Sequence, residues 1–145
     1  MQVGTVMHVQ VVTAHPEESA AEAIRRMSEA NVGSTVVVEN NAVVGIFTER
    51  DVLRLAGAGT DFEATHLRGS MTQNPLTVTA DDSILGVAKL MGERRLRHLP
   101  VVEDGNLVGM VSIRDVLGFL AERLYSEQDT AAAETARTLL GHGGG

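Results

Sequence analysis

The chain has 145 residues, no cysteine and a formal net charge of −7. This length suits one compact domain, or two small domains that share a core. The lack of cysteine excludes disulfides, thiolate catalysis and cysteine metal sites, and it fits a reducing compartment, so we expect a cytoplasmic protein. The acidity argues against nucleic acid or an anionic membrane as a partner. The apolar runs are far shorter than the roughly 20 residues of a membrane span, and we expect no signal peptide.

The first half of the chain alternates between strand and helix signals. A short apolar strand is followed by Pro16-Glu17-Glu18-Ser19, whose acidic residues suit the positive end of a helix. Apolar residues then recur at helical spacing, and Gly33 is expected to end that helix. Asn40-Asn41 indicates the turn of a hairpin. The predicted elements are a strand at 9–13, a helix at 16–33, strands at 34–39 and 43–47, and a helix at 48–55.

The second half repeats this order because the sequence itself recurs 64 residues later. Aligning 3–55 with 67–119 gives 14 identities in 53 positions. The elements predicted here are a strand at 76–79, a helix that starts at 81–83, strands at 99–103 and 107–111 joined by an Asp-Gly turn, and a helix at 112–124. A half of about 60 residues would be marginal alone, so we expect each half to cover the other's apolar face.

The predicted fold class is α+β (α/β), with two βαββα repeats packed pseudo-symmetrically as one unit. We assign residues 1–62 to the first repeat, 63–125 to the second, and 126–145 to a C-terminal tail. Within the tail, Ser126 to Asp129 resembles a capping box at a helix start, and Gly141 is a candidate helix stop. The tail is either an appended helix that can dock on a partner subunit or a disordered segment.

One seven-residue motif occurs in both repeats, as Gly45-Ile46-Phe47-Thr48-Glu49-Arg50-Asp51 and as Gly109-Met110-Val111-Ser112-Ile113-Arg114-Asp115. Its glycine falls within a strand, where the lack of a side chain lets a ligand or backbone approach closely. Its Thr or Ser stands where strand turns into helix, and a helix N-terminus offers unpaired N–H groups to a phosphate. Its Asp follows one turn later and can accept hydrogen bonds from both hydroxyls of a ribose.

The two repeats differ where their second strand begins. The first has the uncharged Gly33-Ser34-Thr35-Val36, and the second has Arg97-His98-Leu99-Pro100. Arg can clamp a phosphate with two hydrogen bonds and His can donate to it, so we expect phosphate-bearing ligands to depend on Arg97 and His98. The alternative is that Arg97 only ends a basic run on a solvated helix end, where cations offset the helix dipole.

These motifs, with Arg97-His98-Leu99-Pro100-Val101-Val102, resemble the tandem cystathionine-β-synthase (CBS) domain pair, or Bateman module, over about residues 3–125. The resemblance implies a non-enzymatic regulatory module that binds an adenosine-containing ligand in one or two clefts between the repeats. The implied ligands are AMP, ADP, ATP, NAD and S-adenosylmethionine. It also implies a flat homodimer formed through the helices, and an output through an unknown effector protein or a change of oligomeric state.

The resemblance also implies a role for individual residues. Asp51 and Asp115 would bind ribose, Thr48 and Ser112 would bind ribose or phosphate, and backbone near Thr13-Ala14 and Thr77-Val78 would frame adenine. Arg50 and Arg114 either reach phosphate or only cover helix surface. The nucleotide-binding residues so assigned are Thr13, Ala14, Gly45, Thr48, Arg50, Asp51, Thr77, Val78, Arg97, His98, Leu99, Pro100, Gly109, Ser112, Arg114 and Asp115.

Two other interpretations stay open. Thr48 with Asp51, and Ser112 with Asp115, are also plausible helix caps, which need no ligand. On that interpretation the chain is a constitutive dimerisation or scaffold module with vestigial clefts. An enzyme is the third interpretation, but we assign no catalytic and no metal-binding residue, because the five His residues share no metal-ligand spacing and no nucleophile has an evident base. We interpret the repeated methionines, Met7 with Met71 and Met27 with Met91, as packing residues.

Overall fold

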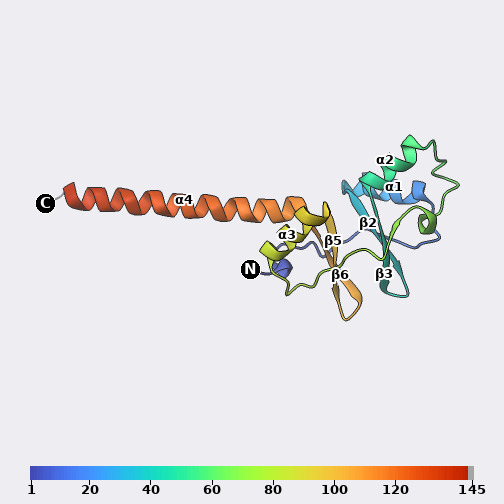
Figure 1. Cartoon of the computed structure of the whole chain (residues 1–145), viewed down its shortest axis with the longest axis horizontal. Coiled ribbons are helices and arrows are strands. Elements are labelled where there is room, and N and C mark those ends of the chain that lie inside the picture. Colours follow the sequence, from blue (N-terminus) through green and yellow to red (C-terminus); the bar gives the residue numbers. More distant parts are fainter. Residues whose placement is uncertain (144–145) are drawn as a thin grey trace.

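The strand and helix signals are realised as one mixed sheet with helices packed on it (Figure 1). The structure is a computed structural model that describes residues 1–143. The helices are α1 (Ala20–Ala30), α2 (Glu49–Gly57), α3 (Ile84–Arg94) and α4 (Ile113–Gly143), with short 3-10 turns η1 (Val3–Thr5) and η2 (Leu67–Gly69). The strands are β1 (Thr13–Ala14), β2 (Ser34–Glu39), β3 (Ala42–Thr48), β4 (Thr72–Gln73), β5 (His98–Glu103) and β6 (Asn106–Ser112). The predicted α+β class and its two related repeats are confirmed.

The sheet joins the two repeats through their hairpins. Its strand order is β1-β2-β3-β6-β5, with β4 paired to β3. The hairpins β2–β3 and β5–β6 have the same antiparallel register, and each is irregular at the same place, after Val37 and after Val101. Strands β3 and β6 pair only at Ala42 and Asn106, near the hairpin turns. The opposite ends of these strands, where the motif hydroxyls lie, are therefore not paired across the repeats.

The predicted first strand of each repeat is shorter than expected. In the first repeat only Thr13–Ala14 pair, in parallel, with β2. In the second repeat the predicted strand at 76–79 is reduced to one parallel bridge between Val78 and Val101. The predicted start of α1 is confirmed because Ser19 accepts a hydrogen bond from the Glu22 N–H at 3.1 Å. The predicted stop at Gly33 is wrong, since α1 ends at Ala30 with Asn31 as its C-cap.

The first residues of each repeat pack on the other repeat. Val3 lies in the core of the second repeat, and its N–H donates to the carbonyl oxygen of Asp82 at 2.8 Å. Leu67, its counterpart 64 residues later, lies in the core of the first repeat, and its N–H donates to Glu18 at 2.9 Å. Each of these two segments, η1 with Met7 and His8 in the first repeat and η2 with Met71 in the second, therefore lies on the opposite side of the expected boundary between residues 62 and 63. We call them the exchanged segments.

Three apolar clusters follow from this exchange. One lies under α1 and α2 and includes Phe47 and Leu67, and one lies under α3 and α4 and includes Val3 and Met91. The third joins the two repeats. It consists of Val36, Ile46 and Met110, with Val11, Val38, Val43 and Leu107 at its edge. Each repeat thus covers an apolar face of the other, as the repeat pattern predicts.

The tail is the clearest departure from the sequence-based expectation. Helix α4 runs without a break from Ile113 to Gly143 and projects beyond the body of the molecule (Figure 1). The separate helix start predicted at Ser126 and the stop at Gly141 are therefore wrong. Its counterpart α2 ends at Gly57, and Gly59 follows with φ 71°, whereas the matching residues 121–123 of α4 contain no glycine. Within residues 1–143, no helix combines the length and apolarity needed to cross a membrane.

Candidate functional site

The two motif glycines make room for a methionine of the exchanged segment. A Cβ on Gly109 would lie 2.8 Å from Met7 Sδ and 2.9 Å from the carbonyl oxygen of His8. A Cβ on Gly45 would overlap the Met71 side chain, whose Cγ would be 2.9 Å away. The close approach predicted for these glycines is thus made by the chain's own segments, and the packing interpretation of Met7 and Met71 agrees with their positions.

Both motif hydroxyl–carboxylate pairs form helix caps. The Thr48 N–H donates to Asp51 Oδ2 at 2.9 Å as part of a capping box at α2. At α4, the Ser112 N–H and hydroxyl donate to Asp115 Oδ2 at 3.1 and 2.7 Å, and the Asp115 N–H donates back to Ser112 Oγ at 3.2 Å. The capping interpretation therefore describes both motifs without a ligand. It does not exclude binding, because a carboxylate has further lone pairs.

The helix N-termini offer less to a phosphate than expected. The Glu49 N–H donates to the Gly33 carbonyl at 3.1 Å, and the Ile113 N–H donates to the Arg97 carbonyl at 2.8 Å. These are the first N–H groups of α2 and α4, so the expectation of unpaired groups fails at this position. A phosphate near either helix must rely more on side chains than on these backbone donors.

The second carboxylate oxygen distinguishes the two motifs. Asp51 Oδ1 faces Arg54 Nη2 at 3.4 Å, and the same nitrogen donates to the Ser70 carbonyl at 2.9 Å. Asp115 Oδ1 instead faces His8 Nε2 at 2.8 Å. The Asp51 side chain is 9% exposed and that of Asp115 is 17% exposed. Burial on its own would raise the pKa of Asp115, but hydrogen bonds from Ser112 and His8 outweigh it and hold that pKa below its ordinary value.

Residues from both repeats meet beside this carboxylate. A Cβ on Gly33 would lie 3.2 Å from His98 Nε2 and 3.2 Å from the Glu49 carboxyl carbon, so the missing side chain admits both groups. Burial lowers the pKa of His98, and Arg97 adds to this effect, whereas the charges of Glu49 and Asp115 oppose it. The structure therefore brings His98 and Asp115 of the second repeat close to Glu49 of the first.

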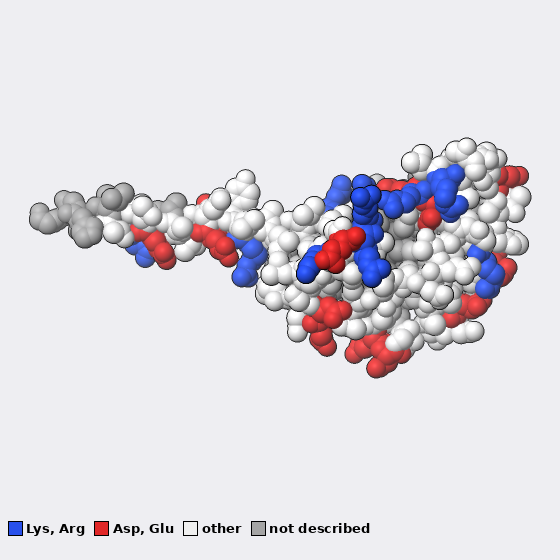
Figure 2. Space-filling view, viewed as in Figure 1, with Lys and Arg blue, Asp and Glu red and all other residues white. Residues whose placement is uncertain are grey.

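The three arginines predicted as phosphate-binding residues are not neutralised by ion pairs within the described chain. Arg54 and Arg68 are held in ion pairs, but within the described part of the chain no ion pair involves Arg50, Arg97 or Arg114. All three side chains are exposed. Figure 2 shows Lys and Arg side chains in a band that crosses the molecule from α3 toward α2, although the chain as a whole is acidic. A local positive potential of this kind suits an anionic ligand.

The residues expected to frame adenine are partly committed to the fold. Ala14 and Val78 are each 5% exposed and lie in the two repeat cores, as does Leu99. The Val78 N–H donates to the Pro100 carbonyl at 3.0 Å, so it is not free for a ligand. Thr13 and Thr77 are exposed. The Thr13 backbone is also partly committed, because it pairs with β2 and its carbonyl accepts from Arg26 Nη1 at 3.1 Å.

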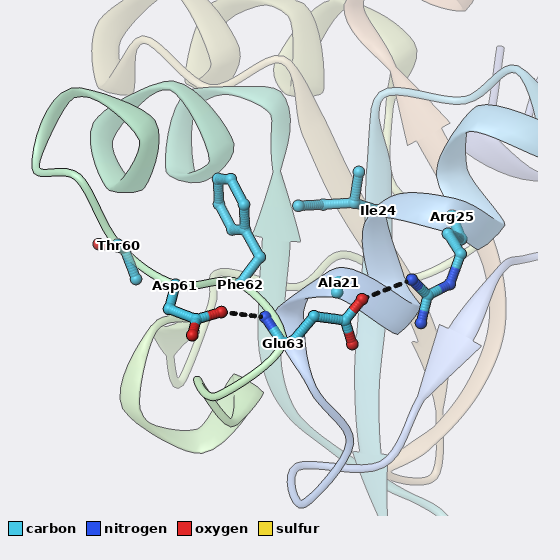
Figure 3. A pocket seen from close by; sticks show the side chains of 7 residues that line it. All are labelled: Ala21, Ile24, Arg25, Thr60, Asp61, Phe62 and Glu63. Atoms are coloured by element: carbon cyan, nitrogen blue, oxygen red, sulfur yellow. Dashed lines mark hydrogen bonds and ion pairs between the residues drawn. The ribbon is translucent and has the colours of Figure 1, made fainter.

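The cavities lie apart from the motif carboxylates. One of about 320 Å³ lies between the repeats and is lined by Thr13, Val38, Asn41, Asn106 and Leu107, so it includes one predicted residue. Another cavity, of about 420 Å³, lies between α1 and residues 60–63, and none of the predicted site residues lines it. Figure 3 shows Ile24 and Phe62 pointing toward each other across it, beside the Arg25–Glu63 ion pair of 2.8 Å. Neither Asp51 nor Asp115 lines either of these two cavities.

The sequence interpretation missed His8 and Glu49 as neighbours of the candidate site. The only sequence signal for His8 is that the repeat replaces it by Thr72. Its contact with Asp115 depends on the exchange of segments, which no local pattern reveals. Within the described residues, no group of three or more His, Cys, Asp or Glu side chains is arranged to hold a metal ion.

Comparisons with known proteins agree with this geometry. The family model described as CBS domain matches residues 3–57 and 64–122. Protein MK0525 of Methanopyrus kandleri is 37% identical over 81% of this chain and 61% of its own length, so this chain spans about three fifths of that relative. The CBS domain-containing protein YhcV of Bacillus subtilis is 33% identical over 89% of both chains. The solved CBS domain pair of protein MJ0100, in complex with 5′-methylthioadenosine and S-adenosyl-L-methionine, is 24% identical with a TM-score of 0.79, over 85% of this chain and 98% of that one.

Proposed function

The chain belongs to the CBS domain family, and from this premise we propose that it is a non-enzymatic sensor of an adenosine-containing ligand. The ligand binds beside Asp115, where the two repeats meet, and changes the affinity of the protein for a partner or for a second copy. AMP, ADP, ATP, NAD and S-adenosylmethionine are the candidate ligands. The lack of cysteine leads us to place it in a reducing compartment such as the cytoplasm.

The observation that carries this proposal is the gathering of matching chemistry around one carboxylate. Asp115 can accept from ribose hydroxyls, His98 lies within its electrostatic reach, and Arg97, whose charge acts on His98, is an exposed cation without an ion-pair partner in the described chain. The MJ0100 pair shares the fold and is described with two adenosine-type ligands. Together these features support a ribose and an anionic 5′ substituent as the recognised groups.

The second cleft is the better candidate of the two. Asp51 is nearly buried, and Arg54 covers its second oxygen while also bonding to Ser70. Its neighbours at the start of β2 are Gly33 and Ser34, which carry no charge. We therefore propose one working cleft at Asp115 and a first cleft in which Asp51 serves mainly as a helix cap.

A homodimer through the helices is part of the proposal. Leu53 on α2 and Leu117 on α4 occupy matching positions in the repeats and are 74% and 58% exposed. Leu124 and Tyr125 extend this apolar surface along α4, being 61% and 70% exposed. Exposed apolar surface on two related helices is typical of a protein–protein interface.

A thermal-shift panel of AMP, ADP, ATP, NAD and S-adenosylmethionine tests the proposal. A ligand at about 100 times its Kd stabilises the fold by about 2.7 kcal/mol, which raises the Tm by several degrees. We expect at least one ligand to do so with the unmodified protein and with Asp51→Asn, but not with Asp115→Asn. Stable proteins that respond to none of the five ligands would contradict the sensor proposal.

A constitutive dimerisation module is the second candidate. It is favoured by one observation, namely that both motif carboxylates are already engaged as helix caps. Sedimentation analysis separates the two functions. A dimer whose Kd is unchanged by Asp51→Asn, by Asp115→Asn and by all five ligands would support this second candidate.

A further inference from the structure

We propose that His8 is a gate on the second cleft, one that holds Asp115 while the cleft is empty and must release it when a ribose binds. This inference rests on the proposed function, because it concerns regulation of the same site. It adds a residue from the N-terminal segment to a cleft that the motif assigns only to the second repeat. It also identifies a contact that opposes ligand binding.

The backbone of His8 is held firmly against β6. Its N–H donates to the Met110 carbonyl at 2.8 Å, and the Met110 N–H donates to the His8 carbonyl at 2.9 Å. The absence of a side chain at Gly109 allows this approach, since a Cβ there would lie 2.9 Å from the His8 oxygen. The position of His8 beside Asp115 is therefore built into the sheet.

The side chain of His8 is, by contrast, free to leave. It is 64% exposed, and its one polar contact within the described chain is with Asp115, 2.8 Å from Nε2 to Oδ1. Rotating it into solvent opens no buried cavity and leaves the two backbone hydrogen bonds with Met110 intact. Because the imidazole regains water contacts when it leaves and a ribose hydroxyl takes its place on Asp115, a ligand can displace it at a small net cost in free energy.

Displacement is required because few acceptor positions of Asp115 remain. Oδ2 already accepts from the N–H and the hydroxyl of Ser112. Oδ1 is the oxygen on which His8 lies. A ribose that donates hydroxyl hydrogens to this carboxylate in a paired arrangement therefore needs the place of the imidazole. Binding thus exchanges one hydrogen bond to Oδ1 for another.

The first repeat shows what a closed arrangement looks like. The residue that matches His8 is Thr72, which is exposed and makes no side-chain hydrogen bond within the described chain. Asp51 is covered there by Arg54, which is also held by the Ser70 carbonyl at 2.9 Å. Arg54 has two anchors and His8 has one. The second cleft therefore has a cover held by one side-chain hydrogen bond, whereas the cover of the first is held by two.

Adenosine is the suitable probe, because it carries the ribose and no phosphate. Arg97 and His98, with Glu49 of the other repeat, also lie close to this region and would respond to a phosphate. Isothermal titration calorimetry with adenosine compares the unmodified protein with His8→Thr, which copies the residue of the first repeat. We expect the Kd to fall about fivefold, since one competing hydrogen bond is lost. His8→Gln, which restores a donor of similar reach, should return the Kd toward that of the unmodified protein.

Imidazole ¹⁵N resonances give a direct readout of the gate. Adenosine should shift the His8 signals toward those of a solvated side chain, and Asp115→Asn should do so without ligand. Thr72→Ala, at the matching position, is the control and should leave the Kd unchanged. Asp115-dependent binding with a Kd that His8→Thr leaves within twofold, or weakens, would overturn the gate but not the proposed function. Failure of both the unmodified protein and His8→Thr to bind adenosine or any of the five ligands would overturn both.

Discussion

The two repeats carry the same motif but hold its carboxylate in different ways. In the first repeat, Arg54 lies one turn after Asp51 and covers it. The matching residue of the second repeat is Gly118, which has no side chain, and His8 from the exchanged segment takes that place. Duplicating a motif therefore does not duplicate a site. The residues that decide whether the carboxylate is available lie one turn further along the helix and on a different segment.

The largest expected effect tests the exchange of segments. Leu67→Ala should lower the free energy of unfolding by about 3 kcal/mol, because Leu67 is fully buried in the core of the first repeat. Leu76→Ala, nine residues further along the chain at a leucine that is 41% exposed, is the control and should cost less than about 1 kcal/mol. Urea denaturation measures both values. Equal losses of unfolding free energy in the two variants would show that Leu67 of η2 is not part of the core of the first repeat.

Gly109→Ala and Gly45→Ala compare how tightly the two exchanged segments pack against the motif glycines. We expect Gly109→Ala to destabilise by about 2 kcal/mol, since the new Cβ meets the His8 backbone as well as Met7. Gly45→Ala should cost less, although its closest contact is tighter, because only the flexible Met71 side chain must move. Thermal unfolding of the two variants gives the order. The reverse order would mean that the N-terminal segment yields more easily than Met71.

The dimer proposal predicts equal roles for the two repeats. Leu53→Glu and Leu117→Glu should each weaken self-association about tenfold or more, which is about 1.4 kcal/mol, because each introduces a charge into the apolar interface. Leu85→Glu on α3, where the leucine is 68% exposed, is the matched control outside these helices. Analytical ultracentrifugation measures the three Kd values. Loss of association with Leu85→Glu alone would move the interface to α3.

The smallest expected effect is the pH dependence that His98 and Asp115 of the second repeat contribute. The lowered pKa of His98 means that the unfolded chain binds more protons just below the ordinary value of 6.5, so stability is full above that value and falls as pH drops through the lowered pKa. The lowered pKa of Asp115 acts in the same direction at lower pH, with its contribution present above the ordinary value of 3.8.

Urea denaturation between pH 3 and pH 8 checks this sign. His98→Ser, which copies Ser34 of the first repeat, should flatten the slope just below pH 6.5. Asp115→Asn should flatten the acidic end, and it should also extend the slope below pH 6.5 to lower pH, because the Asp115 charge raises the pKa of His98. Ser34→Ala is the control and should change neither region. An unchanged profile in His98→Ser would show that burial of the imidazole does not perturb its titration.

Local patterns predicted most of the elements, and the reason is visible at particular residues. Ser19 and Ser83 cap their helices through the N–H three residues later, a purely local interaction. The turn at Asp104-Gly105 has φ of 51° and 80°, which that residue pair favours. Local patterns failed at Gly33, whose small size serves His98 and Glu49 rather than the helix end, and at Ser126, which lies inside a continuous helix.

The sequence by itself determined the repeat, its hairpins and the capped carboxylates, because these depend on spacing within a few residues or on a fixed period. Only the tertiary structure decided that Val3 and Leu67 exchange cores, that Met7 and Met71 fill the space beside the motif glycines, and that His8 reaches Asp115. These contacts join residues far apart in the chain, and they depend on how the two halves close over each other. That closure is set by burial of apolar surface, which is not directional and leaves no local signature in the sequence.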